Sequence, residues 1–304
     1  MRRAGRSRIA AFALVFVLVG VLLVVGLSTG CSAGSEDSPE GPRVVATTSI
    51  VAEMARKVAG TRLRVDQLLP DGASPHDLQL SARDRADAES ASLIVENGAG
   101  LEAGLGLDSV QVPRFALIDH VGPLLRSGPD GRPDPHFWMD PDRMAAALPD
   151  LARAFSRIDP SSAGFFRNRA QAEVRRLERT GREMSQVLSV IPAGSRKLVT
   201  SHDSLAWFCE RFAFEFVAAP FPSSGAEAEA SAASVREAES AIERAGVPAV
   251  FPEAESNPRV LEQIASRTGV EVIQGLRVEG PAPGSDYTAM LLADSRLIAR
   301  GLGR

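Results

Sequence analysis

Histidine is the residue type in this sequence whose chemistry is most specific, and the chain contains four of them. Three stand beside a proline or an acidic residue, where a predicted strand or loop meets a helix: His76, His136 and His202. A neutral imidazole is a borderline ligand that suits Zn²⁺, and three imidazoles with one carboxylate make a tetrahedral site. The acidic neighbours would then fix the tautomers of the rings. These residue types favour a transition-metal site.

The spacing of these three histidines is not distinctive in itself. They lie roughly 60 residues or more apart, unlike the compact ligand patterns of a zinc finger or of a His-Glu-x-x-His helix. In open parallel sheets, however, ligands gather beyond the carboxyl ends of the strands, and His76 and His202 each follow a predicted strand. Two alternatives stay open at this point. The histidines converge on one metal ion, or they are surface and helix-capping residues.

Short apolar runs alternate with helical patterns along most of the chain. Apolar runs typical of strands cover residues 43–48, 63–69, 92–95, 115–118, 197–200, 247–251 and 270–273. Helical spacing of apolar residues covers residues 49–59, 83–91, 204–212, 232–245, 258–268 and 287–302. This alternation predicts α/β architecture with mostly parallel sheets.

One helical pattern is longer than the others and divides the chain. It runs without interruption over residues 160–190, and Pro192 and Gly194 end it. The predicted fold is therefore α/β, with two similar lobes of mostly parallel sheet joined by one long rigid helix and the metal site in the cleft between them. We expect the lobes at residues 43–158 and 192–304, and the linking helix at residues 159–191.

The N-terminus has the layout of an export signal. Four arginines between Arg2 and Arg8 precede an apolar run from Ile9 to Leu27, and small residues then lead to Cys31. A cysteine in this place predicts a lipoprotein: a signal peptide at residues 1–30, lipidation of Cys31, and a flexible tether over residues 31–42. An uncleaved membrane anchor and a plain secreted form are the alternatives, because Ser28 replaces the usual leucine before the cysteine. All three place the rest of the chain outside the cytoplasmic membrane.

The composition excludes some partners. The net charge is −4, with no dense basic block after the N-terminus, so nothing indicates nucleic acid binding. The second of the two cysteines, Cys209, has no disulfide partner if Cys31 carries lipid. It lies in a Trp-Phe-Cys-Glu stretch that predicts a buried, packed thiol.

Residues 43–304 resemble the zinc- and manganese-binding lipoproteins of metal ABC importers, the cluster A-I solute-binding proteins. The resemblance rests on segments in the same order as in that family: 45–50, 72–76, 95–102, 134–141, 201–203, 250–253 and 286–287. The most specific is Asp-Pro-His-Phe-Trp-Met-Asp-Pro at residues 134–141.

The resemblance implies a ligand set and a function. The family's metal ligands fall on His76, His136, His202 and, as the carboxylate, Asp286. It implies a monomeric, lipid-anchored protein at the outer face of the cytoplasmic membrane. Such a protein is not an enzyme: it captures a divalent metal and delivers it to the permease and ATPase of an importer. A linking helix of this kind implies limited closure of the lobes. A surface adhesin role is a less favoured alternative.

Ligand softness favours Zn²⁺ over Mn²⁺ for three histidines and one aspartate, although a bidentate Asp286 would also accommodate Mn²⁺. The loop Gly122–Pro133 is short and lacks the histidines that many zinc-type members carry, and His120 matches no ligand position. Glu253 is expected to support the site without ligating. A zinc hydrolase with Glu253 as its general base, and a binding protein for a siderophore or corrinoid, are the rival functions.

Overall fold

The computed structural model describes residues 41–71, 73, 79–127, 131–221 and 230–303. Two residues on which the sequence analysis relied, His76 and Cys31, lie outside these ranges, as does the expected signal segment. None of the helices within the described ranges is long and apolar enough to cross a membrane.

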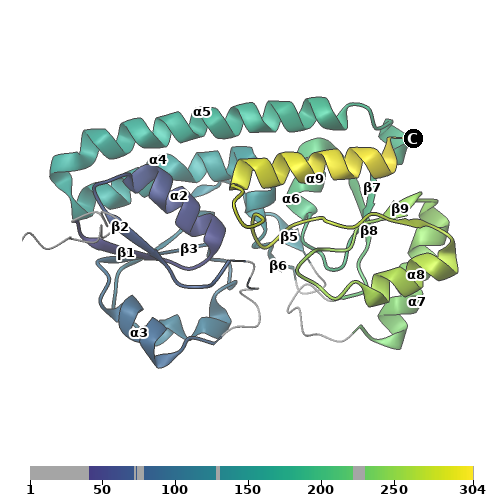
Figure 1. Ribbon diagram of the computed structural model, residues 1–304, viewed down its shortest axis with the longest axis horizontal. Coiled ribbons are helices and arrows are strands. Elements are labelled where there is room, and N and C mark those ends of the chain that lie inside the picture. Colours follow the sequence, from purple (N-terminus) through teal and green to yellow (C-terminus); the bar gives the residue numbers. More distant parts are fainter. Residues whose placement is uncertain (1–40, 72, 74–78, 128–130, 222–229, 304) are drawn as a thin grey trace, which may run out of the picture. The chain divides into compact units, whose positions relative to one another are not determined.

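The N-terminal lobe is built on a four-stranded parallel sheet (Figure 1). Its strands are β1 (Arg43–Ala46), β2 (Arg64–Gln67), β3 (Leu93–Glu96) and β4 (Arg114–Ala116), in the order β2-β1-β3-β4. Strand β3 is buried along its whole length, as expected for a central strand covered on both faces. The helices of this lobe are α2 (Ser49–Ala59) and α3 (Ala82–Glu89).

The C-terminal lobe repeats this strand order. Its strands are β7 (Lys197–Val199), β8 (Glu215–Ala218), β9 (Ala249–Val250) and β10 (Glu271–Val272). The pairs β7–β8 and β9–β10 are parallel, and a parallel bridge between Thr200 and Phe251 joins them, giving the order β8-β7-β9-β10. Helices α6 (Ala206–Phe212), α7 (Ala232–Ala245) and α8 (Arg259–Thr268) belong to this lobe. The prediction of two similar α/β lobes with mostly parallel sheets is confirmed.

The three longest helices pack on one another. Helix α4 (Pro141–Ile158) packs against α2 and against α5 (Ala163–Leu188), and α9 (Tyr287–Leu302) also packs against α5 (Figure 1). With 26 residues, α5 is the long linking helix that the sequence predicts; it spans about 39 Å. It begins later than the pattern indicates, because Pro160–Ser162 forms a separate 3₁₀ turn.

The remaining elements are short. Strands β5 (Arg126–Ser127) and β6 (Arg132–Pro133) form an antiparallel pair. Single 3₁₀ turns also occur at Ala103–Leu105, Leu107–Ser109, Leu117–His120, Phe137–Met139 and Ala193–Ser195.

The largest hydrophobic core is shared by both lobes. It combines residues of β1, α2 and α4 with residues of α6 and α9, among them Phe137, Phe155, Trp207, Phe251 and Tyr287. Each lobe also has a smaller core of its own, one around Ile94 and one around Val250. A common core resists separation of the lobes, because opening it would expose apolar surface from both sides. Cys209 is buried with a free thiol, as predicted.

Candidate metal centre

His136 is held by its own chain segment. The segment 134–139 leads from the N-terminal lobe into α4, and His136 is fully buried in it. One carboxylate oxygen of Asp134 accepts a hydrogen bond from the backbone N–H of His136 at 2.8 Å and lies 2.8 Å from its Nδ1 atom. A ring that donates Nδ1–H to this carboxylate has its lone pair on Nε2, which is the atom that would bind a cation.

His202 is held in the same way from the other lobe. It follows β7, and its Nδ1 atom lies 2.5 Å from Oε2 of Glu253. The second oxygen of Glu253 accepts a hydrogen bond from the hydroxyl of Ser204 at 2.7 Å. Glu253 is buried, and both of its oxygens are therefore engaged in orienting this loop and its imidazole. The sequence analysis expected Glu253 to support the site, and these contacts agree with that expectation.

The two imidazoles meet across the lobes. The Nε2 atoms of His136 and His202 are 3.3 Å apart, and the ring planes are inclined by 63°. Two nitrogens bound to one tetrahedral Zn²⁺ at 2.0–2.1 Å would lie about 3.4 Å apart. The separation in this structure therefore fits two ligands of one ion.

Glu279 is the carboxylate that joins them. It lies on the segment between β10 and α9, is almost fully buried, and offers an oxygen that, with one nitrogen of each histidine, forms a group within 4.8 Å. Burial raises the pKa of Glu279 to about 7, and the two histidines oppose that rise. A cation placed among the three side chains would restore the ionised carboxylate, because its charge compensates for the lost hydration.

The electrostatics of His202 also favour a cation. Burial lowers the pKa of this imidazole, but Glu253, with smaller contributions from Glu279 and Asp203, raises it to about 9. The metal-free site therefore holds protons where a metal ion would sit. Burial likewise raises the pKa of the neighbouring Asp203, against the opposing effect of the two histidines.

Asp286, which the resemblance implies as the carboxylate ligand, is not a member of this group within the described residues, and its assignment as a ligand stays a prediction. It is the N-cap of α9, where its Oδ1 atom accepts the backbone N–H of Ala289 at 2.9 Å. Its Oδ2 atom forms an ion pair with Arg176 of α5 at 2.7 Å. Burial works against ionisation, but Ala289, Arg176 and Thr288 together lower the pKa of Asp286 to about 2.

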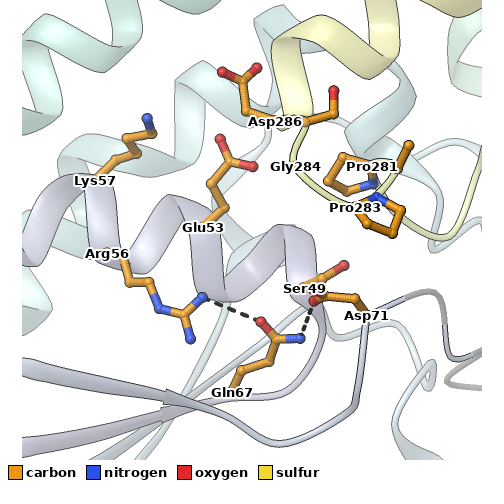
Figure 2. Close-up of a pocket in the computed structure, with 12 residues that line it drawn as sticks. Ser49, Glu53, Arg56, Lys57, Gln67, Asp71, Pro281, Pro283, Gly284 and Asp286 are labelled. Carbon is orange, nitrogen blue, oxygen red and sulfur yellow. Dashed lines mark hydrogen bonds between the residues drawn. The ribbon is translucent and has the colours of Figure 1, made fainter.

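Asp286 is one of the residues that line a pocket of about 450 Å³ (Figure 2). The pocket is lined by residues of α2 and by the segment 281–286, with Asp286 above Glu53. The Oε2 atom of Glu53 accepts the backbone N–H of Tyr287 at 2.8 Å, so α2 holds the first turn of α9. Asp286 is thus part of the packing between α9, α5 and α2.

The sequence analysis also discussed His76 and His120. His76 lies outside the described residues, so its expected role as a ligand stays a prediction. His120 stacks on Phe115 and lies 3.0 Å from Asp150, and it is not a member of the group.

Glu279 is the residue that the sequence analysis missed. It directly follows Leu276-Arg277-Val278, of which Leu276 and Val278 are buried, and it precedes Gly-Pro. Asp286, by contrast, precedes an apolar helix with the pattern of an N-cap. A carboxylate that follows an apolar run, rather than one at a helix start, is the sequence signal that could have identified Glu279.

Comparison with known proteins places most of the chain in one family. Residues 44–301 match the family model described as "Zinc-uptake complex component A periplasmic" (ZnuA). The chain is 29% identical to the iron-binding protein YfeA of Yersinia pestis, over 88% of each chain. It is 24% identical to the manganese ABC transporter substrate-binding lipoprotein PsaA of Streptococcus anginosus, over 90% of this chain and 94% of that one.

A solved structure supports the fold. The periplasmic zinc-binding protein TroA of Treponema pallidum superimposes with a TM-score of 0.80 at 24% identity, over 87% of this chain and 100% of that one.

Proposed function

This chain belongs to the zinc-uptake complex component A (ZnuA) family, and from that premise we propose that it captures one Zn²⁺ ion and delivers it to an ABC-type importer. Membership makes it a metal-binding, non-enzymatic substrate-binding protein of an ABC transporter. The choice of zinc is the further step. The relatives' names include iron, manganese and zinc, so the metal must be argued from the site itself.

The observation that carries the proposal is the meeting of His136 and His202, with 3.3 Å between their Nε2 atoms, beside the buried Glu279. We propose His76 as the fourth ligand, which would give three imidazoles and one carboxylate. Imidazole-rich sites favour Zn²⁺ over Mn²⁺ by ligand softness and by the general affinity order. Mn²⁺ is the alternative, because a bidentate Glu279 would give the higher coordination number that it accepts.

The location and partners follow from the same premise. We propose that residues 1–30 are removed, that Cys31 carries lipid, and that residues 31–42 tether lobes at 43–158 and 192–304, joined by the linking helix 159–191, to the outer face of the cytoplasmic membrane. The relative PsaA is named a lipoprotein, which supports this anchor. The partners would be the permease and ATPase of the importer, with the protein acting as a monomer.

The geometry does not favour the rival functions. A zinc hydrolase would need a free general base, and Glu253 has both oxygens bonded to His202 and Ser204. A siderophore or corrinoid would need a wide cleft at the site, whereas His136 is fully buried and Glu279 nearly so.

Metal content and competitive binding test the proposal. The full-length chain, purified in detergent and stripped of metal, would be titrated with Zn²⁺ and then Mn²⁺ against a chelator of known affinity. We expect one tightly held Zn²⁺ per chain, weakened in each of the variants His76→Ala, His136→Ala, His202→Ala and Glu279→Gln.

His120→Ala is the matched control, because His120 is a partly exposed histidine outside the group. It should leave the zinc affinity unchanged. Absence of stoichiometric metal, or equal affinity in all five variants, would overturn the proposed site. Tighter binding of Mn²⁺ than of Zn²⁺ would support the proposed ligands and overturn the choice of zinc as the metal.

A further inference from the structure

The only two tryptophans of the chain form hydrogen bonds in opposite directions between the lobes. Trp138, in the segment that carries His136, donates its indole N–H to the backbone carbonyl of Val278 at 2.8 Å. Trp207, on α6 of the C-terminal lobe, donates its indole N–H to the backbone carbonyl of Asp134 at 3.0 Å. Trp138 therefore bonds the segment that carries Glu279, and Trp207 bonds the segment that carries His136.

Both hydrogen bonds are sealed from water. Trp138 and Trp207 are 4% and 1% exposed. An indole has one donor and no acceptor, so each ring makes one directed polar contact within an apolar surface. A buried carbonyl that loses such a donor is left unsatisfied, which costs more than the hydrogen bond itself contributes.

The Trp138 contact bears directly on Glu279. The carbonyl of Val278 belongs to the planar peptide unit that ends at the Cα atom of Glu279. Fixing this carbonyl therefore fixes the position of the Glu279 Cα atom, from which the side chain extends. The carbonyl of Trp138 also accepts a hydrogen bond from the Tyr287 hydroxyl, so Trp138 holds the segment 278–287 at both ends.

The Trp207 contact bears on His136 through Asp134. The backbone carbonyl of Asp134 is fixed by Trp207, while the side chain of the same residue bonds both the backbone and Nδ1 of His136. A shift of Asp134 would change the direction of the His136 ring. That ring also meets Trp138 edge-on, with 5.2 Å between the ring centroids.

We propose that Trp138 and Trp207 are positioning residues that hold Glu279 and His136 in register across the lobes. We call this pair of hydrogen bonds the indole clasp. Trp138 acts through Glu279, and Trp207 acts through Asp134 on His136. The inference rests on the proposed metal site.

Double-mutant cycles test the two arms separately. Trp138→Phe and Trp207→Phe keep a buried aromatic ring and remove the donor. Zinc affinity would be measured by chelator competition on the full-length chain in detergent, for each variant in the wild-type, Glu279→Gln and His136→Ala backgrounds. Each tryptophan change alone should weaken zinc binding about three- to tenfold, the size of one buried hydrogen bond.

The pattern across the backgrounds distinguishes positioning from general stability. The effect of Trp138→Phe should disappear when Glu279 is already changed to Gln and persist when His136 is changed to Ala. The effect of Trp207→Phe should show the opposite pattern. If the tryptophans only stabilised the fold, each tryptophan change would weaken zinc binding by the same factor in all three backgrounds. Phe166→Leu, which alters only apolar packing in α5, is the control: it should lower the melting temperature and leave zinc affinity unchanged.

Tyr287→Phe provides a second route if Trp138→Phe does not fold. It removes the hydroxyl that bonds the Trp138 carbonyl and should show the same dependence on Glu279. Unchanged zinc affinity in the tryptophan variants, or an effect that persists in the Glu279→Gln background for Trp138, would overturn the clasp. Failure of the wild type to bind zinc, or indifference to Glu279→Gln, would instead overturn the proposed function.

Discussion

Glu279 and Asp286 stand at the two ends of one short segment, and the structure places them in opposite environments. Glu279 is almost fully buried beside two histidines, and its pKa is raised to about 7. The Asp286 side chain is 38% exposed, is paired with Arg176, and has a pKa lowered to about 2. The protein therefore destabilises the ionised form of Glu279 and stabilises the ionised form of Asp286.

From this difference we infer that Glu279, rather than Asp286, binds the metal ion. The charge of Asp286 is already compensated by Arg176 and by the first turn of α9, so a cation would have to displace existing contacts. The two histidines favour the ionised form of Glu279, and a bound cation would replace the proton that His202 holds in the metal-free protein. The strong desolvation of Glu279 beside two imidazoles is therefore the feature that favours it as the ligand.

The largest expected effect is on zinc affinity when the two carboxylates are neutralised in turn. Glu279→Gln should weaken zinc binding by more than the roughly 10–100-fold typical of groups behind the ligands. Asp286→Asn should change it less than about threefold, because asparagine also caps helices. Chelator competition measures both. A larger loss in Asp286→Asn than in Glu279→Gln would reverse the comparison.

The second effect is the pH dependence of zinc affinity. In the metal-free protein Glu279 has a pKa of about 7 and His202 one of about 9, so zinc must displace protons at pH 7. Affinity should therefore fall as the pH is lowered, about tenfold per pH unit for each proton displaced. Titrations at pH 8, 7 and 6 measure the slope, which should be shallower in Glu279→Gln. A flat profile between pH 8 and 6 would contradict this account.

A smaller effect concerns the stability of the metal-free protein. Asp286→Ala removes a helix cap and should lower the free energy of unfolding by about 0.5–2 kcal/mol at pH 7, with a smaller loss in Asp286→Asn. Because the folded pKa of Asp286 (about 2) is below its ordinary value of 3.8, its contribution is present above about pH 4. That contribution is lost as the pH falls through about 2. Urea unfolding at pH 7 and at about pH 2 measures the free energy of unfolding of the wild type, Asp286→Ala and Asp286→Asn. Equal stability of all three proteins at pH 7 would contradict this prediction.

The smallest effect concerns the stiffness of the segment between the two carboxylates. Pro281 and Pro283 lie within it, and Pro283 is exposed. Pro283→Ala should lower the free energy of unfolding by about 0.4–1 kcal/mol, because the unfolded chain gains freedom. Zinc affinity should change less than about threefold, since Trp138, Tyr287 and the α9 cap hold the ends. A loss as large as that of Glu279→Gln would show that the prolines, rather than the end contacts, position the ligand.

Part of the fold was predictable because it depends on local patterns. The apolar runs of β1, β3 and β7 and the helical periodicity of α2, α5 and α9 are visible along the chain. Helix α4 was not singled out, because Pro149 interrupts its pattern, yet the helix continues through this residue. Strand β8 was missed as well: it is only partly buried and follows α6 almost directly.

The sequence by itself determined the α/β alternation, the long linking helix and the candidate histidines, because each depends on residue type and short-range spacing. Only the tertiary structure decided which carboxylate joins His136 and His202. Glu279 and Asp286 are seven residues apart and similar in chemistry. What separates them is burial beside two imidazoles in one case and an arginine from a distant helix in the other. Both are long-range contacts, and they exist only once the two lobes have packed on a common core.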